Sequence, residues 1–191
     1  MRLYSATGNP GKLREFRLAA AERPEVEIEL LPDFEKLPPY QETGFTFEEN
    51  AVQKARYYGA HAPGLLFADD SGLEVDALGG APGVYSARFG GASASDATNN
   101  RVLLEVLQGV QPRTARFVCV IALVEGDHLR GVFRGAVEGL VGEEPRGSNG
   151  FGYDPLFYYP PFGCTFGEVE PERKLAVGHR GQALRAMLAS L

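Results

Sequence analysis

The sequence predicts an α/β protein with a mixed β-sheet and flanking helices. The chain opens with a strand, a helix and a second strand at 2–6, 13–22 and 26–31, which is typical of a parallel βαβ unit. The stretches 116–124 and 129–141 lie on either side of a Gly-Asp pair and predict an antiparallel hairpin. Because parallel and antiparallel strands are expected in one chain, we predict a mixed sheet.

Three later stretches predict further helices. Thr46 and Glu49 form a capping box for a helix that reaches about His61. Residues 96–107 carry apolar side chains at helical spacing, and residues 181–191 form an amphipathic closing helix. These helices supply the layers that an α/β sheet needs on its faces.

Two regions between the helices are expected to be short or irregular. Residues 65–68 read as a short apolar strand that ends at Asp69, and Gly72 permits a tight reversal after it. Residues 142–173 are rich in turn formers and are expected to form loops.

Length and composition bound the class of protein. A chain of 191 residues with 44% hydrophobic content can bury one substantial core. We expect a single domain over 1–191, with a second lobe at about 73–141. The formal net charge of -6 argues against a broad basic surface for nucleic acid. No apolar run approaches the length of a membrane span. Two distant cysteines, expected to be buried apolar residues, favour a reducing, cytoplasmic compartment.

The first candidate motif is SATGNPGK at 5–12. Its lysine is followed by Leu13 in place of the Ser or Thr that holds magnesium in a Walker loop, so the motif is not a P-loop signature. The glycines around Asn9 and Pro10 still predict a turn whose backbone amides converge on an anion.

The second candidate is a set of acidic residues. LFADDSG at 66–72 places Asp69 and Asp70 next to each other, where carboxylates can bind a hard cation such as Mg²⁺. A turn with solvated carboxylates explains this stretch equally well. Glu48 and Glu49 suit the positive end of a helix, whereas Glu42 lies in the preceding loop and is free to share a metal.

Two more motifs lie in the last quarter of the chain. NGFGYDP at 149–155 offers Phe151 or Tyr153 as a flat face for a base, although a turn anchored by a buried aromatic side chain is the more common structure. ERKLAVGHRGQAL at 172–184 gathers basic side chains before a helix start, where an anion is well placed, and a solvated basic run is the alternative.

Taken together, these motifs resemble the inosine triphosphate pyrophosphatase family, the pyrophosphatases of noncanonical purine nucleoside triphosphates. The resemblance rests on TGNPGK, ETGFTFEENAVQKA, ADDSGLEVDALGGAPGVYSARF, GFGYDPLF and HRGQAL, which occur in this order over nearly the whole chain. It implies an elongated mixed sheet with two lobes around a nucleotide cleft, as in the related Maf-like architecture. It also implies hydrolysis of ITP, dITP and XTP to the monophosphate and pyrophosphate, a requirement for Mg²⁺, and a homodimer.

The resemblance also implies a role for each matching residue. Glu42 and Asp70 would bind the metal, and Asp70 would also be the catalytic base. Asp69 and Glu49 would be supporting acids. The residues implied to bind the substrate are Thr7, Gly8, Asn9, Pro10, Gly11, Lys12, Lys54, Ser71, Phe151, Gly152, Tyr153, Asp154, Lys174, His179 and Arg180.

One departure from the family pattern falls beside the basic motif. Gly178 stands where the family usually has Ser before His-Arg, so this position provides no side-chain cap. Two alternatives to the main hypothesis remain open. One is a Maf-like pyrophosphatase that acts on other or modified nucleotides. The other is a module that binds a purine nucleotide without catalysis. We expect neither nucleic acid nor a membrane as a partner.

Overall fold

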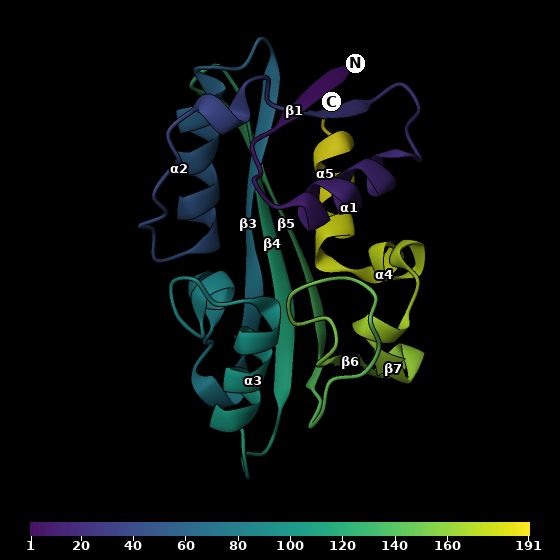
Figure 1. Ribbon diagram of the computed structural model, residues 1–191. Helices are drawn as coiled ribbons and strands as arrows, with labels where there is room; N and C mark the ends of the chain where they lie inside the picture. Colours follow the sequence, from purple (N-terminus) through teal and green to yellow (C-terminus); the bar gives the residue numbers. More distant parts are fainter. The chain divides into compact units, whose positions relative to one another are not determined.

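The structure, a computed structural model, describes residues 1–191 and contains one seven-stranded sheet (Figure 1). Its strands are β1 (Arg2–Ser5), β2 (Glu27–Leu30), β3 (Leu65–Val75), β4 (Thr114–Glu125), β5 (His128–Val141), β6 (Phe157–Tyr159) and β7 (Cys164–Thr165). The strand order is β2-β1-β3-β4-β5-β6-β7. β1 is parallel to β2 and β3, whereas β6 is antiparallel to β5 and β7. The predicted mixed sheet is therefore confirmed.

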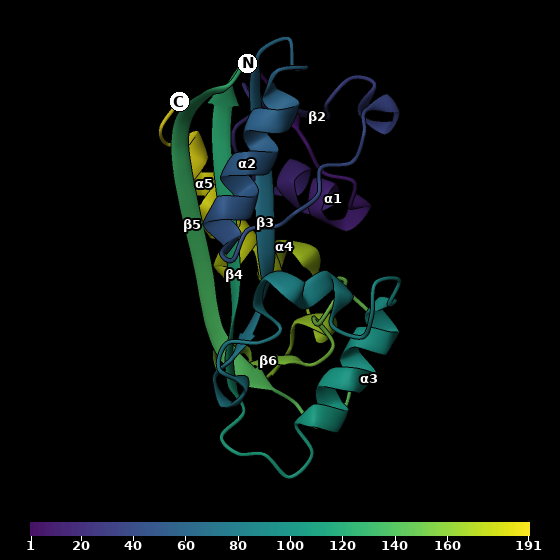
Figure 2. The same cartoon turned by 90° about the vertical axis from the view of Figure 1, so that its left-hand side faces the viewer.

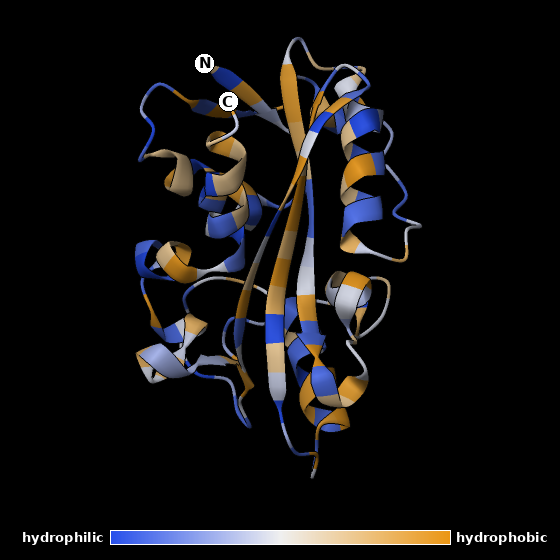
Figure 3. Cartoon of the chain, turned by 180° about the vertical axis from the view of Figure 1, so that it is seen from behind, coloured by the Kyte–Doolittle hydropathy of each residue, from blue (hydrophilic) through white to orange (hydrophobic).

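Five α-helices accompany the sheet: α1 (Pro10–Ala20), α2 (Phe47–Gly59), α3 (Asp96–Val106), α4 (Pro171–Val177) and α5 (His179–Leu188). Figure 3 shows that the helices carry both hydrophobic and hydrophilic residues, as expected for helices with one side on a sheet and the other in water. None of them is long and apolar enough to cross a bilayer.

The chain divides into two compact units. Unit 1 comprises Met1–Asp70, Cys119–Gly135 and His179–Leu191, and unit 2 comprises Ser71–Val118 and Ala136–Gly178. Strands β3, β4 and β5 each contribute residues to both units. The second lobe expected at about 73–141 shares residues 73–118 and 136–141 with unit 2. Residues 119–135 belong to unit 1, and unit 2 continues to residue 178.

Unit 1 has helices on both faces of its part of the sheet. In Figures 1 and 2, α2 lies on one face of β3, and α1 and α5 lie together on the other. The rings of Phe16 and Phe67 pack edge to face with their centroids 5.0 Å apart. A Cβ atom at Gly135 would lie 2.1 Å from the carbonyl oxygen of His179, so glycine allows the start of α5 to approach β5 closely.

Unit 2 has its own apolar core. The rings of Phe117, Phe157 and Phe166 lie at its centre, with centroids 4.4 Å and 5.0 Å apart along the series. Leu103 and Leu107, at and just beyond the end of α3, are fully buried in the same cluster. The helix predicted at 96–107 is confirmed, but of its apolar residues Leu103 and Leu107 are buried whereas Val106 is 43% exposed.

The structure corrects the prediction for residues 65–72. β3 does not end at Asp69 but continues through both aspartates to Val75, and Gly72 makes no reversal. A Cβ atom at Gly72 would lie 2.4 Å from Ser86 Oγ, which accepts a hydrogen bond of 2.9 Å from the Leu73 amide. Glycine is therefore needed here for close packing, and the buried acids interrupt the apolar pattern without interrupting the strand.

Two helix predictions also change. α1 begins at Pro10 and not at residue 13, because Asn9 caps it. The segment expected to be loop at 142–173 contains β6, β7 and the start of α4, whose first residue is Pro171. Proline suits the first turn of a helix, so this residue was a usable signal.

The two thiols have different surroundings. Cys119, in the unit 1 part of β4, is fully buried, and burial together with the nearby Asp69 raises the pKa of its thiol. Cys164 in β7 is only partly buried, so the expectation of a buried residue holds for Cys119 alone. Neither forms a disulfide.

Candidate active site

The N-terminal motif caps a helix. The Asn9 side-chain oxygen accepts hydrogen bonds of 2.8 Å from the Gly11 amide and 3.1 Å from the Lys12 amide. The Asn9 amide in turn donates to the Thr7 hydroxyl at 3.2 Å. The amides of Asn9, Gly11 and Lys12 therefore have partners within the chain, and Pro10 has no amide hydrogen to donate. These four residues do not show the predicted convergence of backbone amides on an anion. The motif instead orients the side chains of Thr7, Asn9 and Lys12.

The two neighbouring aspartates of β3 have different partners. Lys12 Nζ lies 2.9 Å from the Asp69 carboxylate, whereas Asp70 accepts a hydrogen bond of 2.9 Å from the Asn50 amide group. Lys12 belongs to α1 and Asn50 to α2, which cover opposite faces of β3 (Figure 1). Because consecutive residues of a strand point to opposite faces, the two carboxylates meet different helices, although Lys12 and Lys54 act electrostatically on both of them.

The environments of Asp69 and Asp70 shift their pKa values in opposite directions. Burial raises the pKa of Asp69, but Lys12, Lys54 and Arg180 together hold it below its ordinary value, which favours the ionised form. Burial and the negative charge of Glu42 raise the pKa of Asp70 to about 6. A pair of acids with pKa values driven apart is typical of sites in which one group holds charge and the other exchanges a proton.

The loop before α2 places Glu42 beside Lys54 in unit 1. Lys54 Nζ lies 2.5 Å from Glu42, and Asn50 accepts a hydrogen bond of 2.8 Å from the Gly44 amide. Burial lowers the pKa of Lys54, but Asp69, Glu42 and Asp70 outweigh it and raise the pKa above its ordinary value. Asn50, which is fully buried, links the loop to Asp70, and sequence reasoning missed it.

Glu49 has a structural role in this structure. Its carboxylate accepts hydrogen bonds from the amides of Phe45 at 2.7 Å and Thr46 at 3.2 Å, and its own amide donates to the Thr46 hydroxyl. The capping box predicted at Thr46 is confirmed. Both hydrogen bonds of the box keep Glu49 at the helix start.

A buried ion pair lies at the start of α5. Arg180 is paired with Glu15 of α1, and each residue is less than a tenth exposed. Burial lowers the pKa of Arg180, but Glu15 and other acids raise it overall, so the guanidinium stays charged. His179 is also buried. Glu15 was missed because a carboxylate in an amphipathic helix normally faces water; only its position one residue before the buried Phe16 hinted otherwise.

The remaining predicted residues belong to unit 2. Asp154 is buried, and its carboxylate accepts a hydrogen bond of 2.9 Å from the Phe151 amide and lies 2.5 Å from Lys174 Nζ. The same ammonium group lies 5.1 Å from the centre of the Phe151 ring. Tyr153 is buried, and its hydroxyl donates to the Ser86 carbonyl at 2.7 Å. Phe151 remains partly exposed, as does Ser71.

Gly178 ends α4, the helix that carries Lys174. A Cβ atom at Gly178 would lie 2.8 Å from the Lys174 carbonyl oxygen, to which the Gly178 amide donates at 2.7 Å. Glycine therefore relieves crowding against the helix that holds Lys174.

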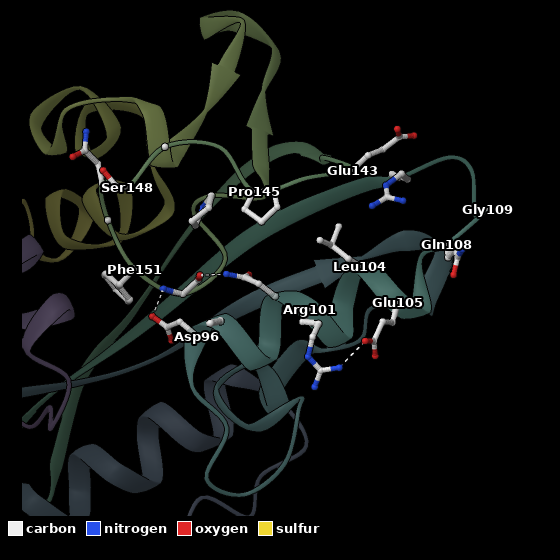
Figure 4. Close-up of a pocket in the computed structure, with 18 residues that line it drawn as sticks. Asp96, Arg101, Leu104, Glu105, Gln108, Gly109, Glu143, Pro145, Ser148 and Phe151 are labelled. Carbon is white, nitrogen blue, oxygen red and sulfur yellow. Dashed lines mark hydrogen bonds and ion pairs between the residues drawn. The ribbon is translucent and has the colours of Figure 1, made fainter.

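Unit 2 also contains an open pocket of about 980 Å³ (Figure 4). Asp96, Arg101 and Leu104 of α3 face it on one side, and the loop with Pro145, Ser148 and Phe151 faces it on the other. Of the predicted unit 2 residues, only Phe151 and Gly152 line it.

Comparison with known proteins assigns the sequence to a family. The sequence matches the Ham1 family over residues 3–190. The chain belongs to the Ham1 family. This match covers both units, so the sequence resemblance to the inosine triphosphate pyrophosphatases, which extends over nearly the whole chain, is confirmed.

Individual Ham1 relatives agree with the assignment. A dITP/XTP pyrophosphatase of an Exiguobacterium species is 50% identical over 191 residues, covering 100% of this chain and 97% of that protein. One from Listeria monocytogenes is 45% identical over 188 residues, covering 97% and 92%. The solved structure of a HAM1 protein from Coxiella burnetii has a TM-score of 0.87 and 41% identity, covering 99% of this chain and 97% of that one. The α/β fold is thus that of Ham1 proteins.

Proposed function

We propose that this protein hydrolyses noncanonical purine nucleoside triphosphates, namely ITP, dITP and XTP, to the nucleoside monophosphate and pyrophosphate. Relatives that it matches over more than nine-tenths of their length are dITP/XTP pyrophosphatases. The observation that carries the proposal is that Lys12 and Lys54 of unit 1, each paired with a carboxylate, both act electrostatically on Asp70, whose pKa is raised to about 6.

In unit 1, the proposed ligand is the triphosphate. Lys12 and Lys54 provide positive charge, and Thr7 and Asn9 provide polar side chains beside Lys12. Both lysines are mostly buried, with exposed side-chain fractions of 16% and 14%, so their charges act in a poorly screened environment. Phosphoryl transfer needs placement and neutralisation of charge more than covalent chemistry from the protein.

We propose Mg²⁺ as the cofactor of the reaction. No cluster of three or more His, Cys, Asp or Glu residues could hold a metal by itself. The two carboxylates of Glu42 and Asp70 suit Mg²⁺ nevertheless, because this ion keeps several waters and is usually held by one or two carboxylates plus substrate phosphates. When bound, it would neutralise charge on the phosphate chain. Asp70 is proposed to accept the proton of the attacking water.

In unit 2, the proposed ligand is the purine. Phe151 supplies a partly exposed ring for stacking, and the Lys174–Asp154 pair fixes the loop behind it. Hypoxanthine and xanthine carry a 6-oxo acceptor where adenine has an amino donor. A site that donates to the oxo group would leave buried groups unpaired against adenine, so adenine nucleotides would be rejected strongly. Arg180 and His179 of unit 1 are the other proposed substrate contacts.

Release of pyrophosphate from a panel of nucleoside triphosphates, with and without EDTA, tests the proposal. We expect turnover of dITP, ITP and XTP that exceeds turnover of dATP and dGTP and stops in EDTA. Preference for dUTP, dTTP or their modified forms would establish the Maf-like alternative. Tight binding of dITP without release of pyrophosphate would establish a module that only binds.

We further propose that the enzyme is a cytoplasmic homodimer. The stretch at 79–89 is the proposed contact surface, because it presents Tyr85 with 55% of its surface exposed and Arg88 lies 5.0 Å from the centre of that ring. Light scattering coupled to gel filtration would give the mass. A monomer at micromolar concentration, or a dimer that persists unchanged in the Tyr85→Ser variant, would refute this surface.

A further inference from the structure

Helix α3 holds both backbone polar groups of Gly152, its N–H and its carbonyl oxygen. The carboxylate of Asp96, the first residue of α3, accepts a hydrogen bond of 2.7 Å from the Gly152 amide, which is drawn in Figure 4. One helical turn later, the Asn100 side chain donates to the Gly152 carbonyl at 3.0 Å. Both contacts lie within unit 2 and span more than 50 residues of sequence.

The held peptide directly follows Phe151. Gly150 and Gly152, on either side of the ring, have φ angles of +75° and +61°, in the left-handed region. Glycine visits that region freely, and so a loop with two such residues has many alternatives to the observed shape. Asp154 binds both backbone groups of Phe151, and the Tyr153 hydroxyl donates to the Ser86 carbonyl. Between these two anchored residues, Gly152 is held by Asp96 and Asn100 of α3.

The amide of Asn100 has a second feature that points to function. Asn100 is 7% exposed, and its Oδ1 atom has no hydrogen-bond partner. A buried acceptor without a partner lowers stability. Turning the amide over would place its oxygen against the Gly152 carbonyl, so the observed orientation keeps the donor on the loop and leaves the oxygen unpaired. The residue type is thus suited to the loop and poorly suited to the core.

We propose that Asp96 and Asn100 are positioning residues for the purine. They fix the Gly152 peptide, and through it the plane of Phe151 on which the base stacks. This inference rests on the proposed function, since it assigns a role within the same reaction. Neither residue need touch the nucleotide, and neither takes part in phosphate chemistry.

The test compares four variants in steady-state hydrolysis of dITP. Asp96→Ala removes the acceptor at the exposed end, and we expect KM to rise roughly three- to tenfold with kcat unchanged, because binding that is equal in ground and transition states is lost. Asn100→Leu removes the donor at nearly constant size, and we expect an increase of about tenfold or more in KM. Asp96→Asn keeps an acceptor and is expected to retain the wild-type KM.

Ser95→Ala is the matched control. Ser95 caps α3 by accepting from the Thr98 amide at 3.2 Å and does not contact Gly152. Its loss weakens the same helix, so the thermal midpoint should fall while KM stays constant. A role in stability alone would make Asp96→Ala behave like this control, with a lower midpoint and no change in KM. That result would overturn the proposal.

Two binding measurements separate the base from the phosphates. Calorimetry with IMP in EDTA should show, for Asp96→Ala and Asn100→Leu, a fold-increase in Kd equal to the fold-increase in KM for dITP. Inhibition by inorganic tripolyphosphate, which has no base, should have the same inhibition constant in all variants. Equal Kd values for IMP would refute the inference even if Asn100→Leu failed to fold, because Asp96 lies on the surface. Failure of the proposed function would appear differently, as a wild-type protein that does not hydrolyse dITP.

Discussion

Replacement of Asp70 by asparagine should make the metal-free protein both more stable and inactive. Burial and the charge of Glu42 raise the pKa of Asp70 from an ordinary 3.8 to about 6. The folded state thus binds the proton more tightly than the unfolded state does. Protonated Asp70 therefore contributes fully to the stability of the folded state below pH 4, and this contribution is lost as the pH rises toward 6. The asparagine side chain would keep an oxygen that accepts the hydrogen bond from Asn50.

The magnitude follows from the two pKa values. At about 1.4 kcal/mol per pH unit, ionisation of this carboxyl in the folded protein costs roughly 3 kcal/mol above pH 6. Asp70 is only 5% exposed, so little of this is removed by solvent. Asp70→Asn should therefore raise the free energy of unfolding by roughly 2–3 kcal/mol at pH 8 in EDTA and by almost nothing at pH 4.

Urea unfolding at pH 4 and pH 8 in EDTA is the assay, with pyrophosphate release from dITP measured in parallel. The exposed Asp33→Asn is a control for loss of one negative charge. Added Mg²⁺ should stabilise the wild type more than Asp70→Asn, because a ligand of the folded state stabilises it by mass action. Equal stability of the variant and the wild type at pH 8 would refute the electrostatic reasoning, and near-normal turnover would remove Asp70 from the mechanism.

Three further predictions concern the ring, the buried ion pair and the loop glycines. Phe151→Ala should raise the KM for dITP roughly tenfold, since stacking on an aromatic ring is worth about 1–3 kcal/mol per base; an unchanged KM in steady-state kinetics would place the base elsewhere. Glu15→Gln should destabilise the fold by roughly 3–5 kcal/mol in urea, because it leaves Arg180 buried and unpaired, and Glu15→Leu with Arg180→Met should recover much of that loss; a double variant weaker than the single one would contradict this. Gly150→Ala should lower the thermal midpoint far more than Gly152→Ala, because a Cβ atom at Gly150 would lie 2.0 Å from a carboxylate oxygen whereas one at Gly152 meets nothing within 4 Å; equal midpoints would be inconsistent with the loop geometry.

Local signals in the sequence predicted most of the fold. Thr46 and Glu49 predicted the start of α2, and the apolar spacing from residue 96 predicted α3, because caps and periodicity act over a few residues. β3 was cut short because Asp69 and Asp70 do not look like strand residues. Their burial depends on Lys12 and Asn50, which lie 57 and 20 positions away in the sequence, and such pairing is invisible to a local pattern.

Sequence reasoning found the candidate site through chemistry and missed its supports. Lys12, Asp70 and Phe151 are unusual residues in their settings, and they were selected for that reason. Asn50, Glu15, Asp96 and Asn100 are ordinary polar residues of helices. What distinguishes them is burial or a contact with a distant loop, and both are properties of the folded chain.

The two cysteines can serve as natural probes of unfolding. Each unit contains a single sulfhydryl, Cys119 in unit 1 and Cys164 in unit 2. Cys119 is sealed in the sheet with its pKa raised by burial, so iodoacetamide can label it only when unit 1 opens. Counting alkylated sites by mass spectrometry would then report the opening of unit 1 separately from the reactivity of the partly exposed Cys164, without any engineered label.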